Sequence, residues 1–249
     1  MLNLPDNSPP ADPDPVRAAL AVVVFAMASL AEKRDADTAK HVLRVQHYVQ
    51  ALAQRLSHHP RFAAILTEPY IAVLFESVPL YDMGTIGIPE RILLKPSRLT
   101  AVEFDLMKTH TTLARDAIEQ AEKSLGLQAE LLHTLKELAY SHQEKWDGSG
   151  YPQGLAGEQI PLSARLTAMA DVYDALITDR VYKAGVPHPQ AVTVIFQGRA
   201  SHFDPDLIDA FMEIQDEFQA IALRFADTEQ DMQLKIEYMA NAIAEQAEL

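Results

Sequence analysis

Hydrophobic residues recur every three or four positions along almost the whole chain, which is the spacing of an α-helix. The clearest stripe predicts a helix over residues 37–56; its members are Val42, Val45, Val49, Leu52 and Leu56. The same spacing predicts further helices over residues 70–80, 100–125, 128–142, 162–180, 188–198, 205–225 and 228–245. We find neither a β-rich stretch nor an internal repeat, so the pattern predicts an all-α fold.

Two segments interrupt the helical pattern. The first is GTIGIP at residues 84–89, where glycine and proline end one helix before the next begins. The second is residues 145–161, which hold four of the nine glycines and two prolines. This density predicts a structured loop rather than a helix, placed directly after the helix that ends at His142.

The two ends of the chain differ from the middle. Residues 1–15 are rich in proline and aspartate, and we expect a disordered leader there. The apolar run 18–31 is shorter than a membrane span and has only Arg17 before it, so we expect a core helix of a cytoplasmic protein with no membrane role. One domain is predicted over 16–226, followed by a separate C-terminal helix over 227–249.

Charge and cysteine content remove several classes of function. The 249 residues include 21 Lys plus Arg against 35 Asp plus Glu, a formal net charge of −14. Phosphate backbones and anionic lipid surfaces repel such a chain, so we expect no nucleic-acid polymer as partner. The chain has no cysteine, which excludes zinc fingers, iron–sulfur clusters and thiol nucleophiles. Any metal site must use the nine histidines and the carboxylates.

Five residues combine the right chemistry with unusual surroundings. His41 shares a helix face with apolar residues, so its imidazole points inward. Asp82 and Asp171 lie among apolar residues, where an unpaired carboxylate is costly. His110 and His142 complete a set on five different helices whose nitrogen and oxygen donors suit Fe or Mn. Taken singly, a histidine of this kind is more often a hydrogen-bonded core residue than a metal ligand.

Longer motifs then bring in a known family. GTIGIPERILLKPSRLT, MKTH, SHQEKWDGSGYPQGLAGEQIPLSARLTAMADVYDALITDRVYK and HFDP resemble the HD-GYP family, from about Glu32 to Phe225. The resemblance implies a single HD-superfamily helical domain with a structured GYP loop. It also implies a centre of two or three metals that hydrolyses the bacterial second messenger cyclic di-GMP by attack of metal-bound hydroxide on phosphorus.

Matching the family's site residue by residue reveals departures. The positions that match its metal ligands are His41, Asp82 (the bridging carboxylate), His110, His142 and Asp171. Three expected residues are replaced: Tyr81 stands for the first histidine of the HD pair, Thr85 for a lysine, and Gln143 for a histidine. No catalytic residue is assigned beyond Asp82 as metal bridge, and we expect at most one tightly bound Fe or Mn.

The loop that faces the ligand in the family is unaltered. Gly150, Tyr151 and Pro152 match the GYP motif, and Arg180 and Lys183 match a basic pair that contacts the nucleotide. Arginine can fork onto phosphate or guanine, lysine adds a point charge, and an aromatic ring can stack on a base. The alternative is a structural turn followed by a solvated helix end.

Together these features predict a degenerate member of the family that binds cyclic di-GMP, or docks onto GGDEF-domain proteins, with little or no hydrolysis. The alternatives are a slow metal-dependent cyclic di-GMP phosphodiesterase, which uses one strongly held metal or Tyr81 as a substitute ligand, and a scaffold without either activity. A seam in the last helix predicts either a homodimer or packing onto its own domain. Its members are Met232, Ile236, Met239 and Ile243.

Overall fold

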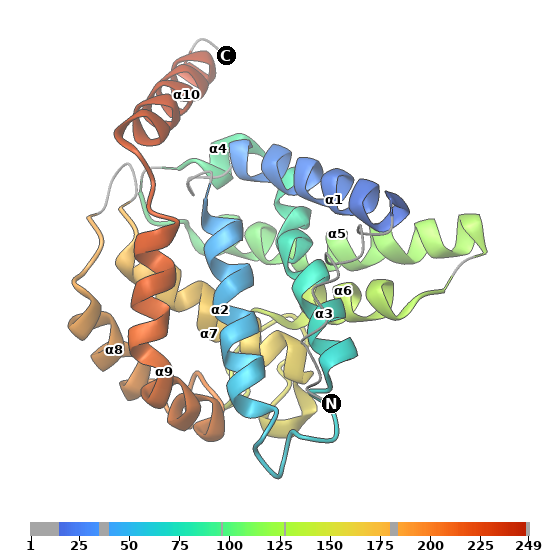
Figure 1. Ribbon diagram of the computed structural model, residues 1–249. Helices are drawn as coiled ribbons and strands as arrows, with labels where there is room; N and C mark the ends of the chain where they lie inside the picture. The colour runs from blue at the N-terminus through green and yellow to red at the C-terminus, as the bar shows by residue number, and fades with distance from the viewer. Residues whose placement is uncertain (1–14, 35–39, 96, 127, 180–183, 248–249) are drawn as a thin grey trace, which may run out of the picture.

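Helices form all the regular elements in the parts of the chain that the computed structural model describes, residues 15–34, 40–95, 97–126, 128–179 and 184–247 (Figure 1). The all-α prediction is confirmed. The α-helices are α1 Pro15–Arg34, α2 His41–Leu56, α3 Glu68–Ser77, α4 Glu90–Leu93, α5 Ala101–Leu125, α6 Glu130–Ser141, α7 Leu162–Ile177, α8 His188–Gln197, α9 Pro205–Arg224 and α10 Glu229–Ala247. Three short 3-10 helices are η1 Val78–Leu80, η2 Met83–Gly87 and η3 Gly157–Gln159.

Local sequence explains where the longest helix begins and ends. Thr100 accepts a hydrogen bond from the backbone N–H of Glu103, and the Glu103 carboxylate accepts one from the backbone N–H of Thr100. This reciprocal pair satisfies two of the N–H groups that a helix start leaves unbonded. Gly126 ends α5 with φ of +64°, a left-handed conformation that glycine adopts without steric cost. Because both ends of α5 are defined, the turn of the helix that carries His110 is defined as well.

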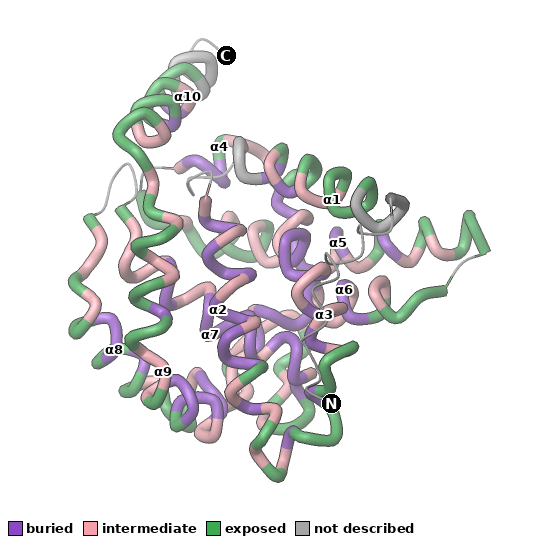
Figure 2. The backbone as a smooth tube through the Cα atoms, viewed as in Figure 1, coloured by how far each residue is buried: buried purple, intermediate pink, exposed green. Residues whose placement is uncertain are grey.

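Helix α2 is the centre of the packing. It lies against α9, α7 and α3, and its predicted apolar stripe is buried throughout (Figure 2). The largest core cluster joins α2 to α3, α7, α8 and α9. Burial of so much of one helix fixes its rotation, which directs His41 at its first residue toward the domain interior.

Helix α1 packs against η1 and η2, and only one of its faces is in the core. Val24, Phe25 and Ala28 pack with residues of α2, α5 and α6, whereas Leu20 and Leu30 are exposed. The prediction of a core helix is therefore correct for one face only. Across the described residues, every helix is too short or too polar to cross a bilayer.

Helix α10 projects from the C-terminal end of α9 and touches α4 (Figure 1). Met239 is buried against Leu94, and Lys235 is buried with it. Ile236, a member of the predicted seam, is 42% exposed, and the Ile243 side chain lies outside the described residues. Of the predicted seam, Met239 is therefore buried within this chain and Ile236 is not, while Lys235 takes a place on the buried face.

Candidate metal centre

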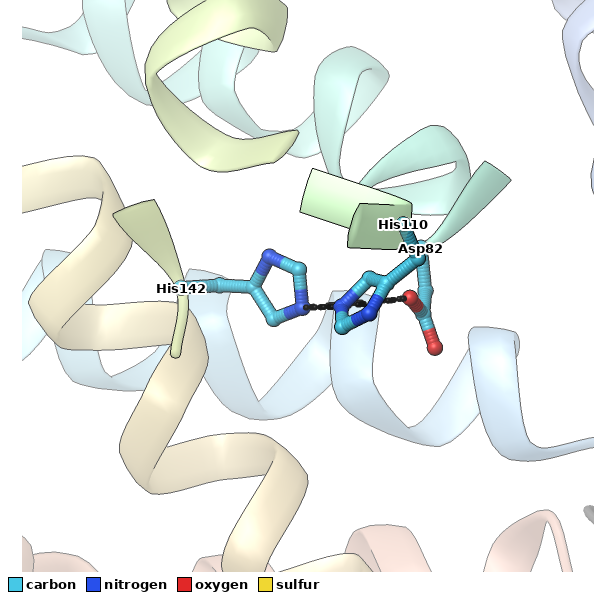
Figure 3. Close-up of side chains that lie close together, drawn as sticks. All are labelled: Asp82, His110 and His142. Atoms are coloured by element: carbon cyan, nitrogen blue, oxygen red, sulfur yellow. Dashed lines mark hydrogen bonds and ion pairs between the residues drawn. The ribbon is translucent and has the colours of Figure 1, made fainter. Parts of the chain in front are cut away.

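Three of the five predicted metal ligands meet at one point. Asp82 follows η1, His110 lies in the middle of α5, and His142 caps the C-terminal end of α6. Figure 3 shows both imidazole rings and the carboxylate directed toward one another. One donor atom from each residue lies within 4.8 Å of the other two. Asp82 comes from a loop between two 3-10 helices, so the prediction that all five residues lie on helices is wrong for it.

A glycine allows this approach. The segment after Asp82 runs so close to α5 that a Cβ atom on Gly84 would lie 1.9 Å from the carbonyl oxygen of His110. Any larger residue would push the segment away from the helix. The glycine of the GTIGIP motif therefore places the Asp82 carboxylate beside the His110 ring.

The spacing of the three donors suits a single divalent ion. The Nε2 atom of His110 lies 3.3 Å from Nε2 of His142 and 3.4 Å from Oδ1 of Asp82, and the third side is 3.8 Å. A circle through these atoms has a radius of about 2.0 Å, close to the bond lengths of about 2.0–2.2 Å that His and carboxylate ligands make to zinc. Two imidazoles with one carboxylate also suit Fe(II).

Both histidines are prepared to act as neutral ligands through Nε2. The Nδ1 atom of His110 lies 2.6 Å from the Met107 carbonyl oxygen, and that of His142 lies 3.0 Å from the Leu138 carbonyl oxygen. Such contacts fix the proton on Nδ1 and leave the Nε2 lone pair directed into the site. Burial lowers the pKa of His110; burial and the neighbouring His110 ring lower the pKa of His142 to about 3. Both rings therefore remain uncharged at neutral pH.

The other two predicted ligands are joined by a tyrosine. The Tyr81 hydroxyl donates to Oδ1 of Asp171 at 2.6 Å and lies 2.9 Å from Nε2 of His41. His41 Nε2 and Asp171 Oδ1 are themselves 3.5 Å apart. The two distances from the hydroxyl oxygen are hydrogen-bond distances, so the Tyr81 hydroxyl group bridges the side chains of His41 and Asp171. Tyr81 also packs edge-on against the His142 ring, which ties the two halves together.

A buried ion pair between Arg44 and Asp174 lies beside the Nδ1 atom of His41. Asp174 accepts two hydrogen bonds from Arg44, at 2.6 and 3.0 Å, and lies 2.8 Å from Nδ1 of His41. Burial opposes ionisation of Asp174, but the His41 hydrogen bond and the Arg44 charge together lower its pKa. Arg44 also bonds Asp227, in the turn between α9 and α10. Arg44 is absent from the residues that the sequence predicts; its one signal is a cation one turn after His41 on the same helix.

The Glu144 carboxylate, which is also absent from the predicted site residues, holds the GYP loop in place. The buried Glu144 side chain accepts hydrogen bonds from the backbone N–H groups of Gln153 at 2.7 Å and Leu155 at 3.1 Å. A Cβ atom on Gly150 would lie 2.3 Å from the backbone nitrogen of Lys145, so only glycine fits. The sequence signal for Glu144 is an acid directly before a glycine-rich loop. Its two hydrogen bonds and the close approach at Gly150 hold the loop against the end of α6.

Tyr151 of this loop faces the metal ligands. Its ring stands edge-on to His110 at 6.2 Å between centroids, and a cis peptide bond joins it to Pro152. Burial and the negative charges of Asp82 and Asp171 raise the pKa of Tyr151. The phenol therefore stays protonated and can donate a hydrogen bond inside the site.

The remaining predicted residues contribute differently. Thr85 is buried and donates its hydroxyl to the Asp82 carbonyl oxygen at 2.8 Å, so it closes a turn where the family's lysine would carry a charge. The backbone carbonyl oxygen of Gln143 accepts a hydrogen bond from the backbone N–H of Tyr151 at 3.2 Å. Arg180 and Lys183 lie outside the described residues.

Comparisons with known proteins agree on one family. The model of the HD domain family matches residues 26–207. A "Probable cyclic di-GMP phosphodiesterase" of Vibrio cholerae is 53% identical over 210 residues, 84% of this chain and 48% of that protein. A second V. cholerae protein, named "Cyclic di-GMP phosphodiesterase", is 48% identical over 206 residues, 83% of this chain and 42% of that protein. The chain thus spans less than half the length of these two relatives.

A solved structure shares the fold. The HDG"Y"P protein Bd1817 of Bdellovibrio bacteriovorus superposes with a TM-score of 0.53 at 19% identity, over 80% of this chain and 62% of that one. At this identity the match concerns the arrangement of helices alone.

Proposed function

The chain belongs to the HD domain family, and we propose that it binds cyclic di-GMP through its GYP side while hydrolysing it little or not at all. The HD-GYP resemblance drawn from the motifs agrees with the names of its relatives. Support for binding comes from the closed GYP loop, whose Tyr151 reaches the His110 side of the centre.

One observation carries the loss of hydrolysis: the Tyr81 hydroxyl bonds both His41 and Asp171. The proposal is that Asp82, His110 and His142 hold one ion and that the Tyr81 side holds none. When bound, that ion supplies positive charge to a phosphate oxygen. The residues themselves fix the donor positions, exclude water through burial of both histidines, and keep the Tyr151 proton available to the ligand.

Magnitudes support impaired chemistry. Even changes that leave the ligands in place commonly cost about 10–100-fold in metal affinity or activity, and here two histidine ligands are replaced. Loss of the lysine charge at Thr85 compares with loss of a preorganised donor, about 10²-fold in rate. A second candidate, a slow cyclic di-GMP phosphodiesterase, is favoured by the names of the relatives and by the complete Asp82 set. Docking onto GGDEF-domain proteins and homodimerisation are further partner proposals.

The test combines binding, metal content and turnover. Cyclic di-GMP is titrated calorimetrically onto protein purified without oxygen, and Fe and Mn are measured on the same sample. The variant Tyr81→His/Thr85→Lys/Gln143→His should hydrolyse cyclic di-GMP at least about 10²-fold faster than the parent. Adding Asp82→Asn to this variant is the control that must abolish the gain. Efficient turnover by the parent, or two stoichiometric ions per chain, would overturn the proposal.

A further inference from the structure

An exposed aromatic side chain lies next to Tyr151, the tyrosine that contacts His110. Phe104 lies on α5, six residues before His110, and is 43% exposed. A phenylalanine left this open to water loses part of the free energy that its burial would give. The domain's own packing therefore does not account fully for its place.

A chain of ring contacts links Phe104 to the centre. Its ring meets the Tyr151 ring at 6.0 Å between centroids and an interplanar angle of 84°. Tyr151 in turn meets His110 at 6.2 Å and 89°. Tyr151 thus separates an exposed ring from a metal ligand, and a nucleotide whose phosphate reaches the His110 side can extend its base over Phe104.

The ammonium group of Lys108 lies over the Phe104 ring. The ammonium nitrogen of Lys108 lies 4.9 Å from the Phe104 centroid and 2.8 Å from Oδ1 of Asp105. An exposed cation–π contact is weaker than stacking of a base on an aromatic ring, so exchange favours the base. Once displaced, the lysine carries its positive charge on a flexible stem that can follow the ligand's phosphate.

From these contacts we infer that Phe104, which Tyr151 contacts edge-on, is a stacking platform for one purine base of a cyclic dinucleotide, with Lys108 as its exchangeable cover. The inference rests on the proposed function, because it assumes that the ligand's phosphate lies at the Asp82 set. It adds a base subsite on α5, outside the GYP loop. Every base has a π-face, so the platform strengthens binding without choosing between guanine and adenine.

The test compares substitutions on one helix, with binding of cyclic di-GMP measured calorimetrically in the full chain. Phe104→Ala should weaken binding by about 5- to 150-fold, the range found when a stacking side chain is truncated. Val102→Ala is the matched control: Val102 lies on the same turn and is 80% exposed, so its binding should stay within about twofold. Phe104→Trp keeps a stacking surface and should bind within about threefold of the parent, and it also serves if Phe104→Ala does not fold.

The outcomes separate the two proposals. If the parent binds and Phe104→Ala binds equally well, or if Phe104→Trp loses as much as Phe104→Ala, the platform is wrong and the proposed function stands. Equal losses in Val102→Ala and Phe104→Ala also overturn the platform, because they indicate disturbance of α5. If the parent binds no cyclic di-GMP, the proposed function fails and the platform with it.

Discussion

Removing one oxygen atom, in Tyr81→Phe, tests the hydrogen-bonded half of the centre. The ring and its edge-on contact with His142 are retained, while the bonds to His41 and Asp171 are lost. A hydrogen bond to a charged group contributes about 1.5–3 kcal/mol. The Asp171 side chain is 25% exposed, so water can replace part of the loss, and we expect a destabilisation of about 1–2 kcal/mol. For a chain of this length, that corresponds to a fall in Tm of about 2–8 °C.

The assay is thermal unfolding in EDTA and again in excess Mn²⁺. Tyr140→Phe is the control, since it keeps the ring that lies under Arg115 and should leave Tm nearly unchanged. Tyr81→His should become more dependent on metal than the parent, because an ion present at 100 times its Kd stabilises the folded state by about 2.7 kcal/mol. If Tyr81→Phe unfolds with the parent in EDTA, the hydroxyl does not hold His41 and Asp171, and the argument against a second ion is refuted.

Three further predictions concern the loop and the histidines. Glu144→Gln, which removes the charge that holds two backbone N–H groups, should lower the free energy of unfolding by about 1–3 kcal/mol and expose the loop to limited proteolysis. Gly150→Ala should cost at least about 2 kcal/mol, seen as a lower denaturant midpoint, because the new methyl group meets backbone atoms; an unchanged midpoint would contradict the packing. The pKa of His142 is lowered to about 3 from 6.5, so without metal its contribution to stability should be complete above about pH 6.5 and decline toward pH 3, with a slope of up to about 1.4 kcal/mol per pH unit that His142→Gln removes.

The ends of α5 could be predicted because local signals decide them. Thr100 caps the first turn of α5 and Gly126 ends its last turn, and each signal involves only residues close to it in sequence. The face that α10 buries could not be predicted from hydrophobicity, because Lys235 is buried on it whereas Ile236 is exposed. Amphipathic spacing is a property of one helix, whereas the face that the helix buries depends on the residues it packs against.

The candidate site divides in the same way. Residue type and motif brought out Asp82, His110 and His142, and the structure brings their donor atoms together. The role of Tyr81 could not be predicted, because its partners lie 40 positions before it and 90 after it in sequence. The same holds for Arg44, whose bonds to Asp174 span 130 positions. Contacts this distant depend on how the helices pack, which no local pattern describes.

The Tyr81 hydroxyl also makes the two halves of the site differ in what they need from outside the chain. The phenol is part of the polypeptide, so its bonds to His41 and Asp171 form without any added ion. The donor atoms of Asp82, His110 and His142 would be bridged only when an ion is taken up. Removing metal with a chelator would therefore alter the second half of the site and leave the first half as it is.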